Sequence, residues 1–537
     1  MIGEPGRLRN AVQRACTEAL GDNTTIDICS DAFHLEAGRA SQPVQTLVVL
    51  GASAYGLPTP VSALLEPALA TIPRADLRRL VLISSAAVEV PRFVHPGMVR
   101  ERRRPARGLD PCADTWADLE QHAQSWCSKH EVELTILRPA AMPFPGSSDP
   151  LARLVHGKAV ATAAGHDPPI QLLDPEDLGR ALARVLDANV SGVFHVAPAG
   201  VVPLHSAIRL SGGRRIPLPM WLLRLMRTAP RAERLRYTAT VSAERLRDEL
   251  GFEPHADSAE VARRAGNSEP GECPSFDDFG QDPAYIGLLR TTLLRFLHDV
   301  YWRVELAGCE HIPAAGPAVL TGVHRGFMPF DGSMALHGVA RETGRLVRFL
   351  IHPSLVKMPF LADFIRRQGG VVACRDNADR LLDRGELVGV FPEGINGAFS
   401  SYRNAYRLRN DFARDEYVKM ALRNRTPIVP FVTVGSVEIF PVLAKLDWGW
   451  WKRFTAWPCF PIAPPFPLAP IPLPTKWHTR FLEPIPVHEM HPPEAARDRR
   501  IVESISCEIK EILQAEIDRM LQRRRHVFFG SIFAEKA

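Results

Sequence analysis

A histidine and an aspartate seven residues apart have the types and spacing for proton-transfer chemistry. His324 follows the apolar run Ala318–Val323, and Asp331 comes after it with Pro329 between them. Esterification of an alcohol by a thioester needs a base with a pKa near 7 to take the hydroxyl proton. It also needs a carboxylate to hold the imidazole in the right tautomer. Taken alone, however, the segment fits a surface histidine beside an N-capping aspartate better.

The spacing of the pair constrains the chain between the two residues. On a straight helix, this spacing would separate them by roughly 10 Å along the axis, which is too far for a hydrogen bond. The stretch Gly326–Pro329 is therefore predicted to loop, so that Asp331 can reach His324.

Two later segments favour the chemical interpretation. Leu387–Gly394 reads LVGVFPEG, an apolar strand that ends in a tight turn presenting the carboxylate of Glu393. Thr426–Gly435 reads TPIVPFVTVG, another apolar strand with Pro430 inside it. In this order the three motifs resemble the lysophospholipid and glycerol-phosphate acyltransferases, over about residues 285–515.

The resemblance implies a role for each matching residue. His324 would be the catalytic base and Asp331 its orienting partner. The residues implied in substrate binding follow the histidine, form the glutamate turn and its following loop, or interrupt the last strand: Arg325, Gly326, Glu393, Gly394, Arg403, Arg407 and Pro430. The expected acyl donor is acyl-CoA or an acyl carrier protein, and the reaction is expected to need no metal and no cofactor.

One departure from the family pattern bears on the acceptor. Many relatives carry an arginine two residues after the glycine of the glutamate turn, where it is thought to meet a phosphate. Here Ile395 and Asn396 follow Gly394. Either Arg403, Arg407 or Arg409 replaces that arginine, or the acceptor carries no phosphate. The acceptor is expected to be the hydroxyl of a glycerolipid or lysophospholipid.

The first 265 residues resemble another family, the extended short-chain dehydrogenases that include NAD-dependent epimerases and dehydratases. Leu80–Val88 resembles the strand and turn that carry the family's catalytic serine, which would be Ser84 or Ser85. The opening residues resemble the second half of its glycine motif, with Gly3 and Gly6. The resemblance implies that these four residues bind NAD(P), although both serines also fit polar residues that close a strand.

The chemistry of that second family is incomplete here. Its proton donor is a tyrosine four residues before a lysine, which lowers the phenol pKa. No tyrosine lies between Tyr55 and Tyr237, and the helix at Asp114–Glu120 carries neither residue type. The N-terminal half is therefore predicted to be degenerate and inactive in hydride transfer. An NAD(P)-dependent oxidoreductase or epimerase remains the first alternative function.

The elements that position these residues indicate two α/β domains. Short apolar runs alternate with helical stretches, which is typical of parallel strands in a doubly wound sheet. The acidic, proline-containing stretch Asn267–Tyr285 is typical of a linker. The prediction is a degenerate Rossmann-like domain at 1–266, a linker at 267–284 and an α/β glycerolipid-acyltransferase domain at 285–537. The predicted strands are Thr46–Leu50, Leu80–Ile83, Leu134–Leu137, Val193–Val196, Ala318–Val323, Leu346–Ile351, Leu387–Phe391 and Ile428–Val434, with helices at Asp114–Lys129 and Pro175–Asp187.

Composition narrows the class of protein and its partners. The 537 residues carry a net charge of +5, and 46% of them are hydrophobic, which is the balance of a globular protein. The nine cysteines occur singly, which favours a reducing, cytoplasmic compartment without a metal site. No apolar run is long enough to span a membrane. The basic clusters lack the aromatic interleaving of nucleic-acid sites, so no nucleic acid is expected.

Two aromatic segments point to an anionic membrane surface. Trp448–Pro474 holds four tryptophans and eight prolines, and Arg519–Phe533 places arginines beside phenylalanines. Such residues favour the bilayer interface. A proline-rich wrap over the core and a solvated tail are the respective alternatives. The expected location is cytoplasmic and peripheral, on the inner face of the membrane. A non-catalytic lipid-binding scaffold is the second alternative function.

Overall fold

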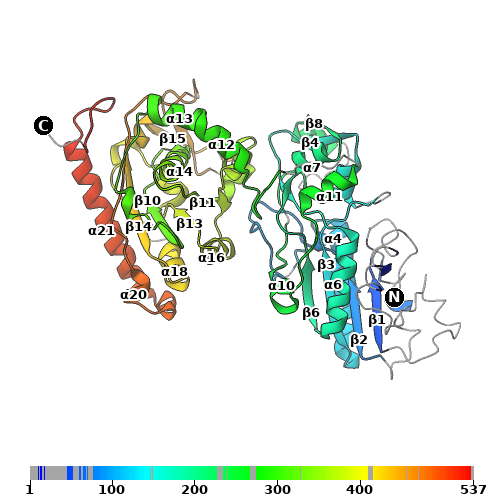
Figure 1. The fold of residues 1–537 in the computed structure, drawn as a ribbon. Coiled ribbons are helices and arrows are strands. Elements are labelled where there is room, and N and C mark those ends of the chain that lie inside the picture. The colour runs from blue at the N-terminus through cyan, green and yellow to red at the C-terminus, as the bar shows by residue number, and fades with distance from the viewer. Residues whose placement is uncertain are drawn as a thin grey trace. The chain divides into compact units, whose positions relative to one another are not determined.

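A computed structural model describes most of the chain after residue 44. The described residues are 45–51, 77–103, 105–144, 147, 149–225, 234–238, 240–266, 274–326, 328–408, 415–455, 457–469 and 471–533, with positions 10, 13, 14, 17, 58, 60, 61, 65–67 and 69 before residue 77. The chain divides into two compact units, Met1–Gln281 and Asp282–Ala537 (Figure 1). The division lies inside the stretch 267–284.

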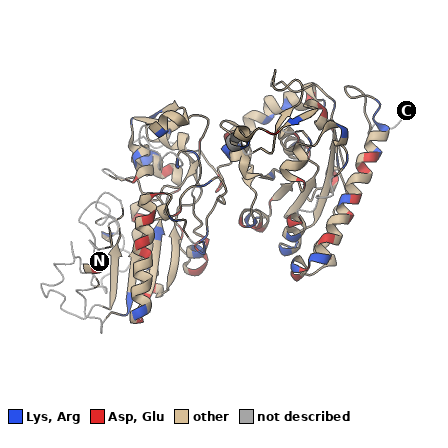
Figure 2. Ribbon diagram, turned by 180° about the vertical axis from the view of Figure 1, so that it is seen from behind, with Lys and Arg blue, Asp and Glu red and all other residues tan. Residues whose placement is uncertain are grey.

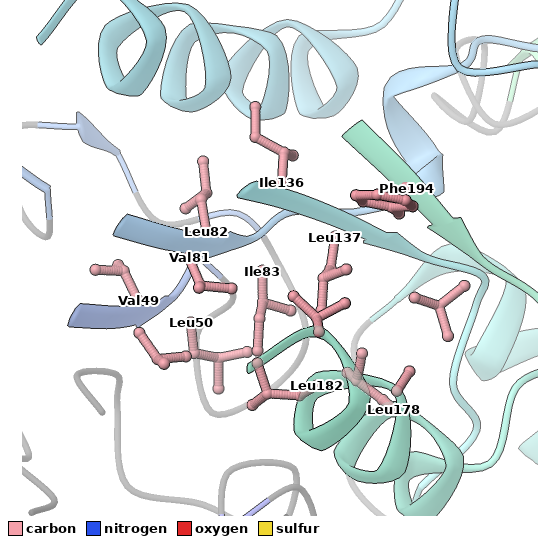
Figure 3. Close-up of a cluster of buried hydrophobic side chains, with 14 of the residues drawn as sticks. Val49, Leu50, Val81, Leu82, Ile83, Ile136, Leu137, Leu178, Leu182 and Phe194 are labelled. Carbon is pink, nitrogen blue, oxygen red and sulfur yellow. The ribbon is translucent and has the colours of Figure 1, made fainter. Parts of the chain in front are cut away.

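The N-terminal unit is built on a parallel sheet with the strand order β1-β2-β3-β6. The strands are β1 (Thr46–Leu50), β2 (Arg79–Ile83), β3 (Glu133–Pro139) and β6 (Gly192–Val196). Figure 3 shows Leu178 and Leu182 of α6 (Pro175–Ala188) against one face of the sheet, with another helix along the opposite face. Helices on both faces of parallel strands make this the predicted doubly wound arrangement.

Local sequence explains where the two long helices of this sheet begin. The carboxylate of Asp110 accepts a hydrogen bond from the backbone of Cys112 at the start of α4 (Pro111–His130), and Asp174 does the same at the start of α6. In both helices proline occupies the first turn, where a missing N–H costs nothing.

A second, smaller core lies in the same unit. Parallel β4 (Ala159–Ala163) and β8 (Arg214–Leu218), and antiparallel β5 (Pro169–Ile170) and β7 (Val202–Pro203), form two small sheets. The accompanying helices are α5 (Pro150–His156), α7 (Leu204–Leu210), α8 (Met220–Leu225) and α11 (Ser258–Ala265). Helix α10 (Glu244–Leu250) packs on the main sheet instead, where Leu246 is buried in the first core.

The C-terminal unit contains a seven-stranded sheet with the order β12-β11-β13-β10-β14-β17-β9. Five adjacent strands are parallel: β12 (Val371–Val372), β11 (Val347–Ile351), β13 (Leu387–Val390), β10 (Ala318–Gly322) and β14 (Ile428–Val434). β17 (His478–Phe481) then pairs antiparallel with β14, and β9 (Glu305–Ala307) completes the edge. The sequence predicts the central strands to within a residue or two but does not predict β9 and β17.

Helices and a short two-stranded sheet surround this sheet (Figure 1). They are α12 (Pro283–Thr291), α13 (Leu293–Phe296), the π-helical turn η2 (Leu297–Tyr301), α14 (Phe330–Thr343), α15 (Leu361–Arg367), α16 (Arg375–Asp383), α17 (Gly394–Ala398), α18 (Glu416–Arg423), α19 (Gly449–Thr455), α20 (Val487–Met490) and α21 (Arg499–Arg523), with the two strands β15 (Ala444–Leu446) and β16 (Phe460–Ile462). Within the described residues, no helix is long and apolar enough to cross a bilayer.

The two segments with aromatic residues pack partly inward. Trp457 and Cys459 are buried in the core, whereas Trp450 and Leu468 are 62% and 97% exposed. In the last segment, the guanidinium of Arg524 is buried and pairs with Glu438 at 2.6 Å. The tail therefore packs on the unit as far as it is described, and Figure 2 shows charges of both signs along α21.

Candidate active site

The carboxyl ends of the central parallel strands bring the predicted motifs together. β10 lies between β13 and β14, and the residues after β10 and β13 are His324 and the turn at Glu393. Ligands of open parallel sheets bind at this edge, where successive chains leave the sheet in different directions. The order of the strands, rather than the order of the motifs in the chain, places the two segments side by side.

The loop between the histidine and the aspartate has the shape that their spacing requires. Gly326 adopts a φ of +88°, which favours glycine, and α14 starts only at Phe330. Asp331 therefore lies in the first turn of α14 and faces back toward β10. The Nδ1 atom of His324 is 2.6 Å from Oδ2 of Asp331. The predicted loop is confirmed, and the pair is in hydrogen-bond contact.

The carboxylate of Asp331 is held firmly. Its side chain is only 1% exposed. Its Oδ2 also accepts the backbone N–H of Arg325 at 3.2 Å, and its Oδ1 accepts the backbone N–H of Gly332 at 2.8 Å. The helix N-terminus favours the negative charge. An ionised carboxylate can only accept, so beside an ionised Asp331 the Nδ1 atom of His324 carries the proton, and in the neutral ring Nε2 keeps a lone pair.

The imidazole of His324 lies at the wall of an apolar cavity. The cavity has a volume of about 120 Å³. Its lining comes from segments far apart in the chain and includes His324, Leu336, Ile351, Leu355, Ile365, Phe391, Phe399 and Trp457. Of the described residues in the lining, only His324 and His352 have ionisable side chains. The cavity suits a hydrocarbon chain with one reacting end at His324.

Aromatic packing fixes the orientation of the imidazole. The ring of Phe391 lies with its centroid 5.0 Å from that of His324, and Phe349 stacks on Phe391 at 5.3 Å. Because Phe349 lies in β11 and Phe391 directly follows the neighbouring β13, the sheet itself supports the ring that faces the cavity.

Arg325 and Glu393, which the sequence predicts to bind substrate, pair with each other instead. Both side chains are 1% exposed, and the guanidinium makes two hydrogen bonds to the carboxylate. The same guanidinium donates to the backbone carbonyls of His324, Ala405 and Arg407. Neither side chain is in the lining of the cavity, because each is committed to the other in the interior.

The other residues predicted to bind substrate are dispersed. Gly394 lines the cavity at the turn, where its φ is +53°. Gly326 shapes the loop, as described above. Arg403 and Arg407 are exposed and lie outside the lining, and Pro430 is buried within β14 opposite Thr321 of β10.

Sequence reasoning does not identify most of the cavity wall. Phe349, Ile351 and Leu355 come from β11 and the turn after it, and their apolar character fits any buried strand. Trp457 has a signal, since it belongs to the tryptophan-rich segment, but the pattern there does not separate an inward from an outward residue. The pairing of Arg325 with Glu393, 68 positions later, has no sequence signal.

In the N-terminal unit, the predicted cofactor residues have other contacts. Ser84 is buried, and its hydroxyl donates to Oε1 of Glu120 at 2.6 Å. Arg138 makes two hydrogen bonds to the same carboxylate, at 2.9 and 2.6 Å, and lies 3.6 Å from Glu89. The hydroxyl of Ser84 is thus committed to Glu120, which lies on α4. The same helix carries no tyrosine four residues before a lysine, so the residues present do not fit hydride transfer from NAD(P).

The remaining predicted cofactor residues add little. Ser85 accepts the backbone N–H of Ala87 at 3.1 Å and borders a second hollow, together with Asp149, Arg234 and Tyr237. Gly3 and Gly6 lie outside the described residues. Within the described part of the chain, no cluster of side chains is arranged to hold a metal ion.

Comparisons with known proteins agree with an acyltransferase domain in the C-terminal unit. The family model described as Acyltransferase matches residues 303–434. The chain is 38% identical over 262 residues to the uncharacterized protein Rv0502 of Mycobacterium tuberculosis, covering 48% of this chain and 72% of that protein. It is 30% identical over 195 residues to the uncharacterized protein Rv0501 of the same organism, covering 33% and 51%. It is also 30% identical over 138 residues to the chloroplastic phytyl ester synthase 1 of Arabidopsis thaliana, covering 25% and 19%.

Solved structures of nucleotide-dependent enzymes are similar to about half of the chain. RMD from Pseudomonas aeruginosa, solved with NADPH, matches with a TM-score of 0.37 and 15% identity, over 49% of this chain and 95% of that one. The UDP-glucose 4-epimerase of Thermus thermophilus, solved with NAD, matches with a TM-score of 0.36 and 17% identity, over 50% and 96%.

Proposed function

We propose, from the premise that this chain belongs to one family with the uncharacterized protein Rv0502 of Mycobacterium tuberculosis, that its C-terminal unit is an O-acyltransferase that moves a fatty acyl group from a thioester to a lipid hydroxyl. The observation that carries the proposal is the position of His324. Its Nδ1 is bonded to a buried carboxylate, and its ring lies at the wall of an apolar cavity.

The proposed reaction uses His324 first as a base and then as an acid. Nε2 takes the proton of the acceptor hydroxyl, and the oxygen attacks the thioester carbonyl. The carbon–sulfur bond breaks, and the thiolate that leaves takes the proton from the imidazolium. Asp331 stabilises the positive charge of that imidazolium and keeps the ring oriented. No metal and no redox partner enters this balance of bonds and protons.

The cavity supports a hydrocarbon substrate. Its lining of leucine, isoleucine, phenylalanine and tryptophan side chains can bury an acyl chain, which is favourable by about 25 cal/mol per Å² of apolar surface. We propose acyl-CoA or an acyl carrier protein as the donor, because both present the acyl group as a thioester.

The acceptor we favour is an alcohol without a phosphate beside its hydroxyl. Within the described lining of the cavity there is no lysine or arginine, and Asn396 stands where many relatives have an arginine. The similarity to a protein named phytyl ester synthase accords with a neutral alcohol. A glycerolipid such as a monoacylglycerol fits this description better than a lysophospholipid does.

Location at a membrane is part of the proposal. Trp448, Trp450 and Ile471 are 40%, 62% and 63% exposed on the segment whose inner side, through Trp457, lines the cavity. Tryptophans in such positions favour the interface between water and lipid. We place the protein on the cytoplasmic face, where anionic lipids would attract its positive net charge.

The N-terminal unit takes no chemical role in this proposal. Ser84 is tied to Glu120 inside a closed cluster, and no observation favours oxidoreductase chemistry there. Titration of the full chain with NADH, followed by its fluorescence, tests whether the unit binds a nucleotide at all.

The experiment for the enzyme class is acyl transfer from labelled acyl-CoA, and from acyl carrier protein, to a panel of monoacylglycerols, long-chain alcohols and lysophospholipids. His324→Ala should lower the rate by about 10²- to 10⁴-fold, the usual contribution of a general base. His488→Ala, in α20 and outside the cavity lining, is the matched control and should keep the wild-type rate. A His324→Ala variant with the wild-type rate would sink the assignment of the base.

A further inference from the structure

A hollow separate from the cavity lies between α12–η2 and α14. Its lining includes Arg290, Arg295 and Arg341, together with Asp299 and His337. The lining holds three guanidinium groups and one carboxylate, and Glu342 outside the lining pairs with Arg341 at 3.2 Å, so a net positive charge remains at the hollow. Arg295 is 71% exposed and lies 3.7 Å from Asp299, while Arg341 is 48% exposed and pairs with the same carboxylate at 2.7 Å. Both arginines therefore keep donor groups open to solvent.

His337, which lines this hollow, and its buried neighbour His298 have ring nitrogens without partners among the described residues. His337 is 4% exposed and His298 is 2% exposed, and their rings meet edge to face at 5.2 Å. Neither ring nitrogen of His337 has a hydrogen-bond partner among the described residues, and the same holds for Nε2 of His298 and Nε of Arg290. Buried polar groups in native proteins are normally satisfied, so these atoms call for an acceptor or donor from outside the chain.

The charge state of His337 fits a hydrogen-bond donor rather than a fixed cation. Burial lowers the pKa of His337 to about 4, with smaller effects in the same direction from His298, Arg290 and Arg341, and an opposing one from Asp299. A neutral imidazole has one N–H to donate, and the arginines supply the positive charge. A phosphoryl group, with several acceptor oxygens and a negative charge, matches this combination.

An apolar stripe runs along the same helices beside the hollow. Leu293, Phe296 and Val300 are 43%, 50% and 60% exposed, at the spacing that puts side chains on one helical face. Leu288 on α12 is a further 60% exposed. The opposite face of these helices is buried, since Leu289 and Leu294 belong to the core. The helices α12–η2 therefore carry apolar side chains on their buried face and on their exposed face, and Arg290 and Arg295 lie beside the exposed apolar stripe.

We infer that the α12–η2 face is a docking surface for an anionic phospholipid bilayer, with the hollow lined by Arg290, Arg295, Arg341 and His337 receiving a lipid phosphate. The partner follows from the complementarity of the surface: the stripe enters the acyl region while the arginines meet headgroups. The inference rests on the proposed function only in placing the protein at a lipid surface, and it needs no acyl transfer to be true.

Sedimentation of the full-length protein with vesicles tests this inference. The vesicles contain either phosphatidylcholine alone or phosphatidylcholine with phosphatidylglycerol. Binding should be stronger with the anionic lipid, and Arg295→Gln should weaken that binding about fivefold, the effect of one basic residue at such a surface. The double variant Arg290→Gln with Arg295→Gln should weaken it about 25-fold, and Leu293→Ser with Phe296→Ser should weaken binding to both vesicle types.

Matched controls come from elsewhere in the chain. Trp221→Ser with Leu225→Ser removes two apolar side chains of α8 that are 64% and 70% exposed, and should leave vesicle binding unchanged. Arg499→Gln removes an 87% exposed arginine from α21 and should do the same. Circular dichroism melting of each variant separates loss of binding from loss of fold.

Each further outcome has a defined meaning. The inference would be overturned if the variants of Arg290, Arg295, Leu293 and Phe296 bound vesicles as well as the wild type does. Calorimetric binding of inorganic phosphate that Arg295→Gln removes, without any vesicle binding, would assign the hollow to a soluble phosphate compound and also overturn it. Acyl transfer to a detergent-dispersed acceptor by a protein that binds no vesicles would reject this surface but keep the enzyme. Vesicle binding without transfer to any acceptor would support this surface but reject the proposed acyltransferase activity.

Discussion

Each unit buries a cluster of charged side chains beside the carboxyl ends of its parallel strands. In the C-terminal unit, Asp331 holds His324, and Arg325 next to it pairs with Glu393. In the N-terminal unit, Arg138 pairs with Glu120, which also holds Ser84. The two clusters thus share their place in the fold and their use of an arginine–carboxylate pair.

The clusters differ in whether their reactive side chain has a free atom at a cavity. His324 is 14% exposed and borders an apolar cavity, so one ring nitrogen can meet a substrate. Ser84 is 2% exposed and its hydroxyl is already donated to a carboxylate. A buried ion pair can hold a reactive group in place, but the group must keep one free atom at a cavity to do chemistry. Of these two clusters, the C-terminal one meets that condition.

The largest effect should come from changing the carboxylate that orients His324. Asp331→Asn keeps the volume of the side chain but no longer fixes the proton on Nδ1, so kcat should fall by roughly 10²- to 10⁴-fold. Steady-state acyl transfer measures this change. Ser84→Ala, the matched change in the N-terminal cluster, should leave kcat as it is. An equal loss in both variants would remove the distinction between the clusters.

Breaking the pair of Arg325 and Glu393 should destabilise the C-terminal unit. Arg325→Met or Glu393→Leu leaves a buried charge without its partner, which costs about 3–5 kcal/mol of unfolding free energy. The double variant should recover much of that stability, as denaturant unfolding would show. Its kcat should stay at least about tenfold low, because Arg325 also holds the carbonyls of His324 and Ala405 beside the base. Recovery of rate together with stability would make the pair purely structural.

The equivalent change in the N-terminal cluster should affect stability alone. Arg138→Met leaves Glu120 and Glu89 buried without their cation, and should cost that unit about 3–5 kcal/mol. Hydrogen exchange resolved along the chain should show the loss in β2, β3 and α4. Acyl transfer should proceed at the wild-type rate while the C-terminal unit stays folded. A parallel loss of transfer would mean that the N-terminal unit supports the reaction.

The smallest effect should come from Glu89. Burial raises the pKa of this carboxyl above 4.5, against a smaller opposing effect of Arg138. The folded state therefore binds the proton more tightly than the unfolded chain does. Its stabilising contribution is complete below the unfolded pKa and is lost as the pH rises through the raised folded pKa. Glu89→Gln should then stabilise the unit at neutral pH by no more than about 1 kcal/mol, and the gain should vanish in acid. A gain that persists in acid would contradict this account.

Local sequence predicts a large part of the fold. The strands Thr46–Leu50 and Ile428–Val434 match the structure at both ends, since continuous apolar runs of that length are typical of strands buried on both faces. The bend between His324 and Asp331 follows from the spacing of the residues and a glycine. The two short strands β9 and β17 have no such pattern, because they depend on partners far away in the chain.

What the sequence determined by itself was the succession of elements and the residues at their ends: a strand before His324, a strand before Glu393, and an incomplete dehydrogenase pattern in the first half. The strands follow from periodicity and turn chemistry, which act over a few residues, whereas the dehydrogenase pattern is a resemblance to a known family. Only the tertiary structure decided that Arg325 meets Glu393 in the interior, that Ser84 is held by Glu120, and that Leu355, Phe399 and Trp457 share one cavity wall. Such contacts join residues tens of positions apart, and they form only where strand order and helix packing bring the side chains within a few ångströms.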